Sequence, residues 1–295
     1  MSEQITVYNS GFYEGFREGS RRSAQRVVPE VLSLLDVKSV VDVGCGVGTW
    51  LHAFRDCGVQ DIQGVDGEYV DLTQLEVAAD KFHPHDLRRP LRLDKQFDLV
   101  VSLEVAEHLA PEFASDFVES LTGLGPVVLF SAAIPFQNGT NHLNEQWPEY
   151  WVERFAARGY VPVDCIRPRV WGNPDVEPWY AQNTLIFVQE SRLQGYPKLA
   201  AARAAMTGGS LSMVHPRIYL NARRDAQHGM IRSSQLDQVP LRRILTSLPT
   251  RVLGALTGRL LHRHPNGSAS QPKETSPTPS PAGPAGLATP SESRT

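Results

Sequence analysis

The sequence lacks the features that mark secreted, membrane-spanning and nucleic-acid-binding proteins. Its only cysteines, Cys45, Cys57 and Cys165, form no C-x-x-C pair, and an odd count argues for a reducing compartment. No run of about 18 apolar residues could span a membrane, and the N-terminus has neither the basic start nor the apolar core of a signal peptide. A net charge of −3 leaves no nucleic-acid footprint. We therefore expect a cytoplasmic protein with no nucleic-acid partner.

The chain of 295 residues is 41% hydrophobic, which is enough for a substantial core. Apolar strands alternate with helical patterns, and this predicts an α/β fold: a doubly wound, mostly parallel seven-stranded sheet with a final antiparallel hairpin. The predicted helices cover residues 49–57, 111–121 and 148–158, and the last three strands cover 126–131, 160–166 and 183–189. We expect four segments: an aromatic N-terminal flap over 1–20, a catalytic domain over 21–194, a helical extension over 195–264 and a disordered tail over 265–295.

A glycine-rich turn follows the first apolar strand, Val40–Val43. Its glycines, Gly44 and Gly46, remove the β-carbons that would keep a ligand from the backbone, and positive φ costs glycine nothing. A nicotinamide-binding turn would need glycine or alanine at Thr49 if it began at Gly44. The nicotinamide-binding motif also has no acidic residue two positions before its first glycine, whereas this chain has Asp42 there. The turn therefore favours a small, flat ligand other than a nicotinamide.

With Asp42 included, the turn reads D-x-G-x-G-x-G and resembles the first motif of class I S-adenosylmethionine-dependent methyltransferases. The run from Phe97 to Leu109, F-D-x-V-x-S-x-E-V-x-E-H-L, is equally specific for that family. In the family a second strand ends in an acid that binds both ribose hydroxyls, which implies Asp66. A residue after the third strand contacts the adenine amino group, which implies Asp86. The resemblance thus implies S-adenosyl-L-methionine as cofactor and the following binding residues: Asp42, Gly44, Cys45, Gly46, Asp66, Gly67, Asp86, Leu87 and Leu103.

Four of these residues also have a structural interpretation. Buried Asp42 could hold backbone amides instead of contacting the cofactor. Asp66 could cap a following helix, because aspartate is a favoured N-cap. Asp86 stands in the polar turn H-P-H-D, where aspartate needs no ligand to explain it. Cys45 suits a small turn residue that offers its backbone amide better than a reactive thiol.

The candidate catalytic residues are His108 and His142, near the carboxyl ends of the fourth and fifth strands. A histidine titrates near neutrality and can accept a proton from a hydroxyl, although His108 could instead hydrogen-bond a loop carbonyl. With Glu104 and Glu107, these histidines also resemble the E-x-x-E-H and later histidine of the small-RNA 2′-O-methyltransferases. That resemblance implies a divalent cation such as Mg²⁺ held by Glu104, Glu107, His108 and His142. Part of the pattern also occurs in the ubiquinone-pathway O-methyltransferases.

The resemblance does not imply an RNA substrate for this chain, because its core has no basic stripe. The phrase H-L-N-E-Q-W-P-E-Y-W, residues 142–151, is similar to bacterial methyltransferases associated with surface glycans or secondary metabolites. We therefore expect O-methylation of a sugar or polyhydroxylated small metabolite. Two alternatives stay open: N- or C-methylation of a small aromatic or amine substrate without a base, and a non-catalytic protein of this fold that docks at a membrane.

Near the C-terminus, residues 240–264 alternate leucines with arginines at helical spacing. Such a basic amphipathic segment could make peripheral contact with an anionic membrane or could pack against the domain. From Pro265 onward proline, glycine, serine and threonine dominate and aromatic residues are absent. This composition has too little apolar surface to offset the entropy of ordering, so it predicts disorder.

We predict that removing residues 265–295 leaves the melting temperature and the affinity for S-adenosylmethionine nearly unchanged. The reason is that a segment that buries no core contributes little to folding. Thermal unfolding and calorimetry of the truncated chain would measure both quantities. A large loss of either would show that the tail packs on the domain.

Overall fold

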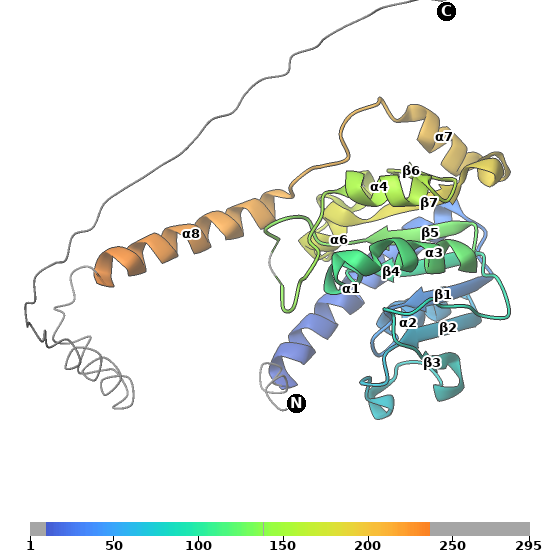
Figure 1. Ribbon diagram of the computed structural model, residues 1–295, viewed down its shortest axis with the longest axis horizontal. Coiled ribbons are helices and arrows are strands. Elements are labelled where there is room, and N and C mark those ends of the chain that lie inside the picture. Colours follow the sequence, from blue (N-terminus) through green and yellow to red (C-terminus); the bar gives the residue numbers. More distant parts are fainter. Residues whose placement is uncertain (1–9, 138, 237–295) are drawn as a thin grey trace, which may run out of the picture. The chain divides into compact units, whose positions relative to one another are not determined.

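The computed structural model describes residues 10–137 and 139–236, and its centre is a seven-stranded sheet (Figure 1). The strands are β1 (Ser39–Val43), β2 (Asp61–Asp66), β3 (Phe82–Pro84), β4 (Leu99–Leu103), β5 (Val127–Ser131), β6 (Tyr160–Val163) and β7 (Leu185–Gln189). They lie in the order β3-β2-β1-β4-β5-β7-β6. Strands β1 to β5 are parallel, and β7 runs antiparallel to β5 and to β6. This confirms the predicted doubly wound sheet with its antiparallel end.

Helices cover both faces of the sheet. They are α1 (Ser10–Leu34), α2 (Thr49–Asp56), α3 (Ala114–Leu124), α4 (Pro148–Ala156), α5 (Arg167–Val170), α6 (Pro178–Asn183), α7 (Pro197–Ala205) and α8 (Pro216–Leu236). Short 3₁₀ turns are η1 (Leu72–Gln74), η2 (Ala79–Lys81), η3 (Ala106–His108), η4 (Pro111–Phe113) and η5 (Glu190–Gly195). Helices α1, α2, α5, α6 and α7 contribute to one hydrophobic cluster, and α3 and α4 contribute to a second one.

The two clusters arise from the alternation of side chains along each strand. Val40 of β1 belongs to the first cluster and its neighbour Val41 to the second, as the period of two requires. Strands β4 and β5 are buried at every position, because central parallel strands are covered on both faces and read as continuous apolar runs. Aromatic packing fixes the second cluster: the rings of Phe155 and Phe187 stack with their centroids 3.8 Å apart.

The N-terminal segment differs from the flap predicted over residues 1–20. From Ser10 onward it is helical and continuous with the helix that leads to β1. Glycines at this end lowered the apparent helix propensity, and one of them has a packing reason. A β-carbon on Gly19 would lie 2.7 Å from the Glu177 carboxylate. Nearby, Ser20 and Tyr180 of α6 share a hydrogen bond of 3.1 Å.

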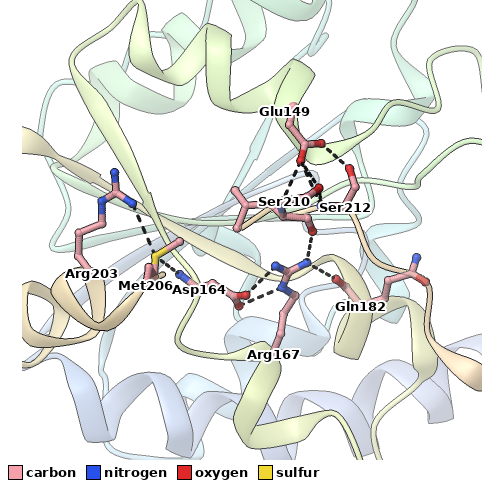
Figure 2. Close-up of polar contacts among 9 residues, drawn as sticks. Glu149, Asp164, Arg167, Gln182, Arg203, Met206, Ser210 and Ser212 are labelled. Carbon is pink, nitrogen blue, oxygen red and sulfur yellow. Dashed lines mark hydrogen bonds and ion pairs between the residues drawn. The ribbon is translucent and has the colours of Figure 1, made fainter. Parts of the chain in front are cut away.

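A buried arginine fastens the segment between α7 and α8 to the sheet. Arg167 is 1% exposed and forms a two-pronged ion pair with Asp164, at 2.9 and 2.6 Å. Its remaining nitrogen donates to the carbonyl oxygens of Gln182, at 3.2 Å, and Leu211, at 2.7 Å. In Figure 2, Glu149 of α4 reaches the same segment through Ser210 and the backbone beside it. Polar contacts therefore add to the packing of Leu211 against the second hydrophobic cluster.

The extension as far as Ile231 belongs to the same compact unit as the sheet. None of the helices in the described residues is long and apolar enough to cross a membrane. The basic segment over 240–264 and the tail over 265–295 lie outside the described residues. Both remain predictions from the sequence.

We predict that Arg167→Met lowers the free energy of unfolding by about 3 kcal/mol or more, because it leaves the Asp164 carboxylate without its partner in a buried setting. Arg169→Met is the matched control, two positions away. Its ion pair with Glu30 is 2.8 Å long but 42% exposed on the arginine side, so its loss should cost about 0–1 kcal/mol. Urea unfolding would measure both variants, and equal losses would contradict the assignment.

Candidate active site at the carboxyl ends of the parallel strands

The glycine-rich turn after β1 is closed by backbone bonds to β2. Gly44 and Cys45 donate their amides to the Val65 carbonyl, at 2.8 and 3.2 Å. Cys45 is therefore a small turn residue that offers its backbone amide, as expected, and in this structure the amide donates to Val65; its contact with the cofactor stays a prediction. Burial raises the pKa of the Cys45 thiol, which agrees with an unreactive side chain.

The three glycines of this turn have positive φ: 88° at Gly44, 53° at Gly46 and 88° at Gly48. Their surroundings differ. A β-carbon on Gly44 would collide with Val105, whereas one on Gly46 would meet no atom within 4 Å. Gly44 is therefore required by packing, and Gly46 borders open space where a ligand can approach the backbone.

Asp66 ends β2 and ties the strand ends together. Its Oδ2 accepts from the Gly46 amide at 2.7 Å, and its Oδ1 accepts from the Gly67 amide at 2.7 Å and from the Tyr69 hydroxyl. No helix begins at this residue, since the next turn, η1, is capped by Asp71. The alternative of Asp66 as a helix cap is therefore wrong.

Asp42 lies inside β1 and is 3% exposed. Burial, with a smaller contribution from the nearby Asp66 charge, raises its pKa to about 8. Among the described residues its Oδ2 has no hydrogen-bond partner, so that oxygen does not hold a backbone amide. A buried carboxylate oxygen without a partner is costly unless a ligand supplies one.

Asp86 follows β3 beside Asp66, because the adjacent His85 amide donates to the Asp66 carbonyl at 2.7 Å. Its carboxylate, however, is bound by Arg88 through the backbone amide at 3.1 Å and the guanidinium at 2.9 and 2.8 Å. These bonds lower its pKa to about 2. The polar-turn interpretation thus describes Asp86 here. Leu87 packs against the second core cluster, and Leu103 ends β4 in the first.

Glu104 stands at the end of β4 with φ of 55°, one of three described residues other than glycine with positive φ. Its two oxygens accept from the side-chain amides of Gln137, at 2.8 Å, and Asn183, at 3.1 Å. Burial raises its pKa, and these bonds lower it in part. Gln182 of α6 extends the network, donating to Gln137 at 3.1 Å.

The predicted metal set of four residues comes together only in part. Ligand atoms of Glu107, His108 and His142 all lie within 4.8 Å of one another, but Glu104 is not among them. The reason is that its carboxylate is occupied by Gln137 and Asn183. The inclusion of Glu104 among the metal ligands is therefore corrected.

Glu107 is the most unusual member of this cluster. Its side chain is fully buried, and burial, followed by repulsion from Glu104, raises its pKa well above the usual range. The amides of Glu107 and Ala133 lie near enough to favour the charged form weakly, yet neither carboxylate oxygen makes a well-formed hydrogen bond among the described residues. A buried carboxylate of this kind is stable only when it is protonated or paired with a cation.

The two candidate catalytic histidines lie edge to face, with ring centroids 4.9 Å apart. Burial and the neighbouring His142 lower the pKa of His108, which keeps its imidazole neutral and able to accept a proton. His142 hydrogen-bonds Glu145 through Nδ1 at 2.8 Å and lines an open pocket with Gly139, Leu143 and Glu145. The structure therefore brings both imidazoles to the rim of the site, as expected.

Sequence reasoning missed Tyr69, Gln137, Asn183 and the role of Glu145. The partners of Asp66 and Glu104 come from loops, and for Asn183 from a helix 79 residues away, so no local pattern marks them. Glu145 alone carried a signal, because it stands three residues after His142 in a polar loop.

Comparison with known proteins gives a consistent result. Residues 16–161 match the family model of a methyltransferase domain, and no curated protein sequence matches the chain. Among solved structures, the sugar N-methyltransferase KedS8 from a Streptoalloteichus species is similar, with a TM-score of 0.47 and 17% identity over 64% of this chain and 98% of that one. CalS10, an amino pentose methyltransferase from Micromonospora echinaspora, has a TM-score of 0.43 and 15% identity over 63% of this chain and 100% of that one. Magnesium protoporphyrin IX methyltransferase from Synechocystis has a TM-score of 0.42 and 18% identity over 61% of this chain and 87% of that one.

We predict that Asp42→Asn removes a pH dependence of stability between about pH 4 and pH 8. The folded state holds the Asp42 proton up to a pKa of about 8, whereas the unfolded chain releases it near pH 4. The free energy of unfolding of the wild-type protein therefore falls as the pH rises through this window, by about 1.4 kcal/mol per pH unit. The variant lacks this loss, so its stability relative to the wild type should increase from pH 5 to pH 8.

Urea unfolding at both pH values measures this difference. Asp86→Asn is the control, because the pKa of Asp86 is lowered and its own stability change falls below about pH 4. A difference between Asp42→Asn and the wild type that stays constant from pH 5 to pH 8 would contradict the assignment.

Proposed function

Since this chain belongs to the class I S-adenosylmethionine-dependent methyltransferases, which its residues 16–161 match, we propose that it transfers the methyl group to a hydroxyl of a sugar or polyhydroxylated small metabolite. The observation that carries this proposal is the imidazole pair: the ring centroids of His108 and His142 lie 4.9 Å apart, and His142, which lines the open pocket, is hydrogen-bonded to a carboxylate. A hydroxyl acceptor gives this pair a proton to remove.

In this proposal the cofactor binds along the turn after β1. The open space beside Gly46 accepts the methionine moiety, and the unpartnered oxygen of Asp42 suits a cationic group. Asp66 binds the ribose hydroxyls, and a ribose hydroxyl replaces the Tyr69 hydroxyl as a donor to Oδ1. The Tyr69 ring is 82% exposed, so it can turn outward without disturbing the core. The role of Asp86 at the adenine stays a prediction, because Arg88 occupies its carboxylate.

The acceptor in this proposal lies against the loop after β5. Three large apolar side chains of that loop stand exposed: Phe136 (85%), Leu143 (62%) and Trp147 (40%). Aromatic rings offer flat apolar faces to the C–H face of a sugar, and the polar groups nearby bind its hydroxyls. This mixture supports a polar acceptor with an apolar face.

The chemistry is a displacement at the sulfonium methyl group supplied by S-adenosylmethionine. The protein's part is to align the acceptor oxygen with the methyl carbon and to remove the hydroxyl proton. His108 or His142 accepts that proton. Glu107 lies beside them, and burial raises its pKa, so its uncharged form is favoured until a positive charge forms next to it.

A divalent cation is a second way to use the same cluster. One carboxylate and two imidazoles provide a ligand set, and the bare oxygens of Glu107 fit it. Two nitrogen ligands suit zinc, manganese or iron better than magnesium, which prefers oxygen. A cation held there would lower the pKa of a bound hydroxyl.

We predict that Gly46→Val abolishes measurable binding of S-adenosylmethionine and that Asp66→Ala weakens it about 10–100-fold, as loss of charge-assisted bonds worth about 1.5–3 kcal/mol implies. Calorimetry measures both. Gly159→Val is the control for Gly46→Val, since Gly159 also has positive φ, 75°, and open space. Unchanged affinity in a folded Gly46→Val protein would refute the cofactor placement. Failure of the wild-type protein to bind the cofactor would favour the non-catalytic alternative.

We predict that His108→Ala and His142→Ala bind the cofactor normally but lose about 10²–10⁴-fold in turnover, the usual contribution of a general base. The assay follows S-adenosylhomocysteine released with a panel of monosaccharides, cyclitols and catechols, and His83→Ala, exposed on β3, is the control. Chelator-sensitive activity restored by added metal supports the cation, and insensitive activity supports the base. Full activity in the double histidine variant would overturn both and leave alignment of the acceptor with the methyl carbon as the source of catalysis.

A further inference from the structure

Glu145 joins a candidate catalytic imidazole to the backbone of the acceptor loop. Its Oε1 lies 2.8 Å from Nδ1 of His142, and its Oε2 accepts from the Phe136 amide at 2.8 Å. The two partners are six residues apart in the loop after β5, so one carboxylate holds them at a fixed separation. The glutamate and histidine side chains are only 20% and 12% exposed, which shields the pair from competing water.

The bond to Glu145 determines which nitrogen of His142 carries the proton. A carboxylate only accepts, so Nδ1 must donate, and in a neutral imidazole the lone pair then lies on Nε2. The Nε2 edge of the ring faces Gly139, where any β-carbon would collide with Nε2 and Cε1. Gly139 and His142 line the same open pocket. A glycine at 139 therefore leaves free the space at the Nε2 edge that any larger residue would fill.

The second bond of Glu145 holds a strained turn. Phe136 has φ of 64°, which is uncommon for a bulky residue, so surrounding contacts must maintain it. Its amide is fixed by Glu145, and the side chain of the next residue, Gln137, is fixed by Glu104. These two hydrogen bonds maintain the turn at Phe136 on the loop that carries His142.

We propose that Glu145 is the positioning residue of the acceptor site, presenting Nε2 of His142 to the acceptor hydroxyl while holding the Phe136 turn against which the acceptor lies. This inference rests on the proposed O-methyl transfer. As the new oxygen–carbon bond forms and the carbon–sulfur bond breaks with its electron pair on sulfur, the hydroxyl proton passes to Nε2. The imidazolium that results lies beside the Glu145 carboxylate, which stabilises its charge.

The test measures the tautomer of His142 directly and needs no known acceptor. Long-range ¹H–¹⁵N spectra of the imidazoles, recorded on chelator-treated protein with His142→Gln used for assignment, distinguish a protonated Nδ1 from a protonated Nε2. Two variants separate the bonds. Glu145→Gln has one carbonyl oxygen for two donors, and Glu145→Ala has none. Glu112→Gln, an exposed carboxylate in η4, is the control. Calorimetry with S-adenosylmethionine accompanies each spectrum.

We expect protonated Nδ1 in the wild-type protein and in Glu112→Gln, and a shift toward protonated Nε2 in both Glu145 variants, with cofactor affinity within twofold throughout. With an accepted hydroxyl compound from the panel, Glu145→Gln should lose about 10–100-fold in kcat, as loss of an orienting partner commonly does. Protonated Nε2 in the wild type, or an unchanged tautomer in folded Glu145→Ala, overturns this inference even if the cofactor binds. Absence of cofactor binding to the wild type would instead overturn the proposed function.

Discussion

The hydrogen bond between the Gly46 amide and the Asp66 carboxylate is the interaction on which the cofactor end of the site depends. At 2.7 Å it joins the turn after β1 to the end of β2, two strands that are already paired in parallel. It works only because Gly44 packs against Val105 without a β-carbon and because the amides of Gly44 and Cys45 are taken up by Val65. These bonds fix the backbone conformation of the turn and the position of the Asp66 carboxylate beside it.

The acceptor end is organised by a second set of carboxylates, and each is treated differently. Glu104 accepts hydrogen bonds from two carboxamides, Glu107 is buried without a well-formed hydrogen bond, and Glu145 is bound to an imidazole and a backbone amide. Burial raises the pKa of both Glu104 and Glu107, so their protonated forms are favoured. A cation bound beside them would favour the charged forms instead. Separate partners thus give neighbouring glutamates separate roles.

The sequence predicted most of the sheet because its signals are local. Apolar runs such as the one in β5 can be accommodated only where both faces are covered, and Gly48 and Gly58 bound α2 on either side. Prediction failed where long-range packing decided. The glycines in α1 obscured a helix, because nothing nearby in sequence revealed that Gly19 faces Glu177.

The same distinction applies to the site. The motifs brought out Asp42 within β1, Asp66 at the end of β2, and Glu107 and both histidines in the loops after β4 and β5. It could not show that Asn183 and Gln137 occupy Glu104, or that Arg88 binds Asp86, since the choice of partner for a carboxylate depends on tertiary geometry. Family resemblance gave the acids their expected roles, and hydrogen bonds in the folded chain removed Glu104 from the metal set.

We propose that the cofactor lies at the joined ends of β1 and β2. Titration of ¹⁵N-labelled protein with S-adenosylhomocysteine, followed by amide resonances, locates the ligand residue by residue. We expect the largest shifts at Gly46 and Gly67, whose amides share the Asp66 carboxylate, with smaller shifts at His142. Shifts centred instead on the pocket at the opposite end of the sheet, around Arg92 and Arg158, with Gly46 and Gly67 unmoved, would contradict it.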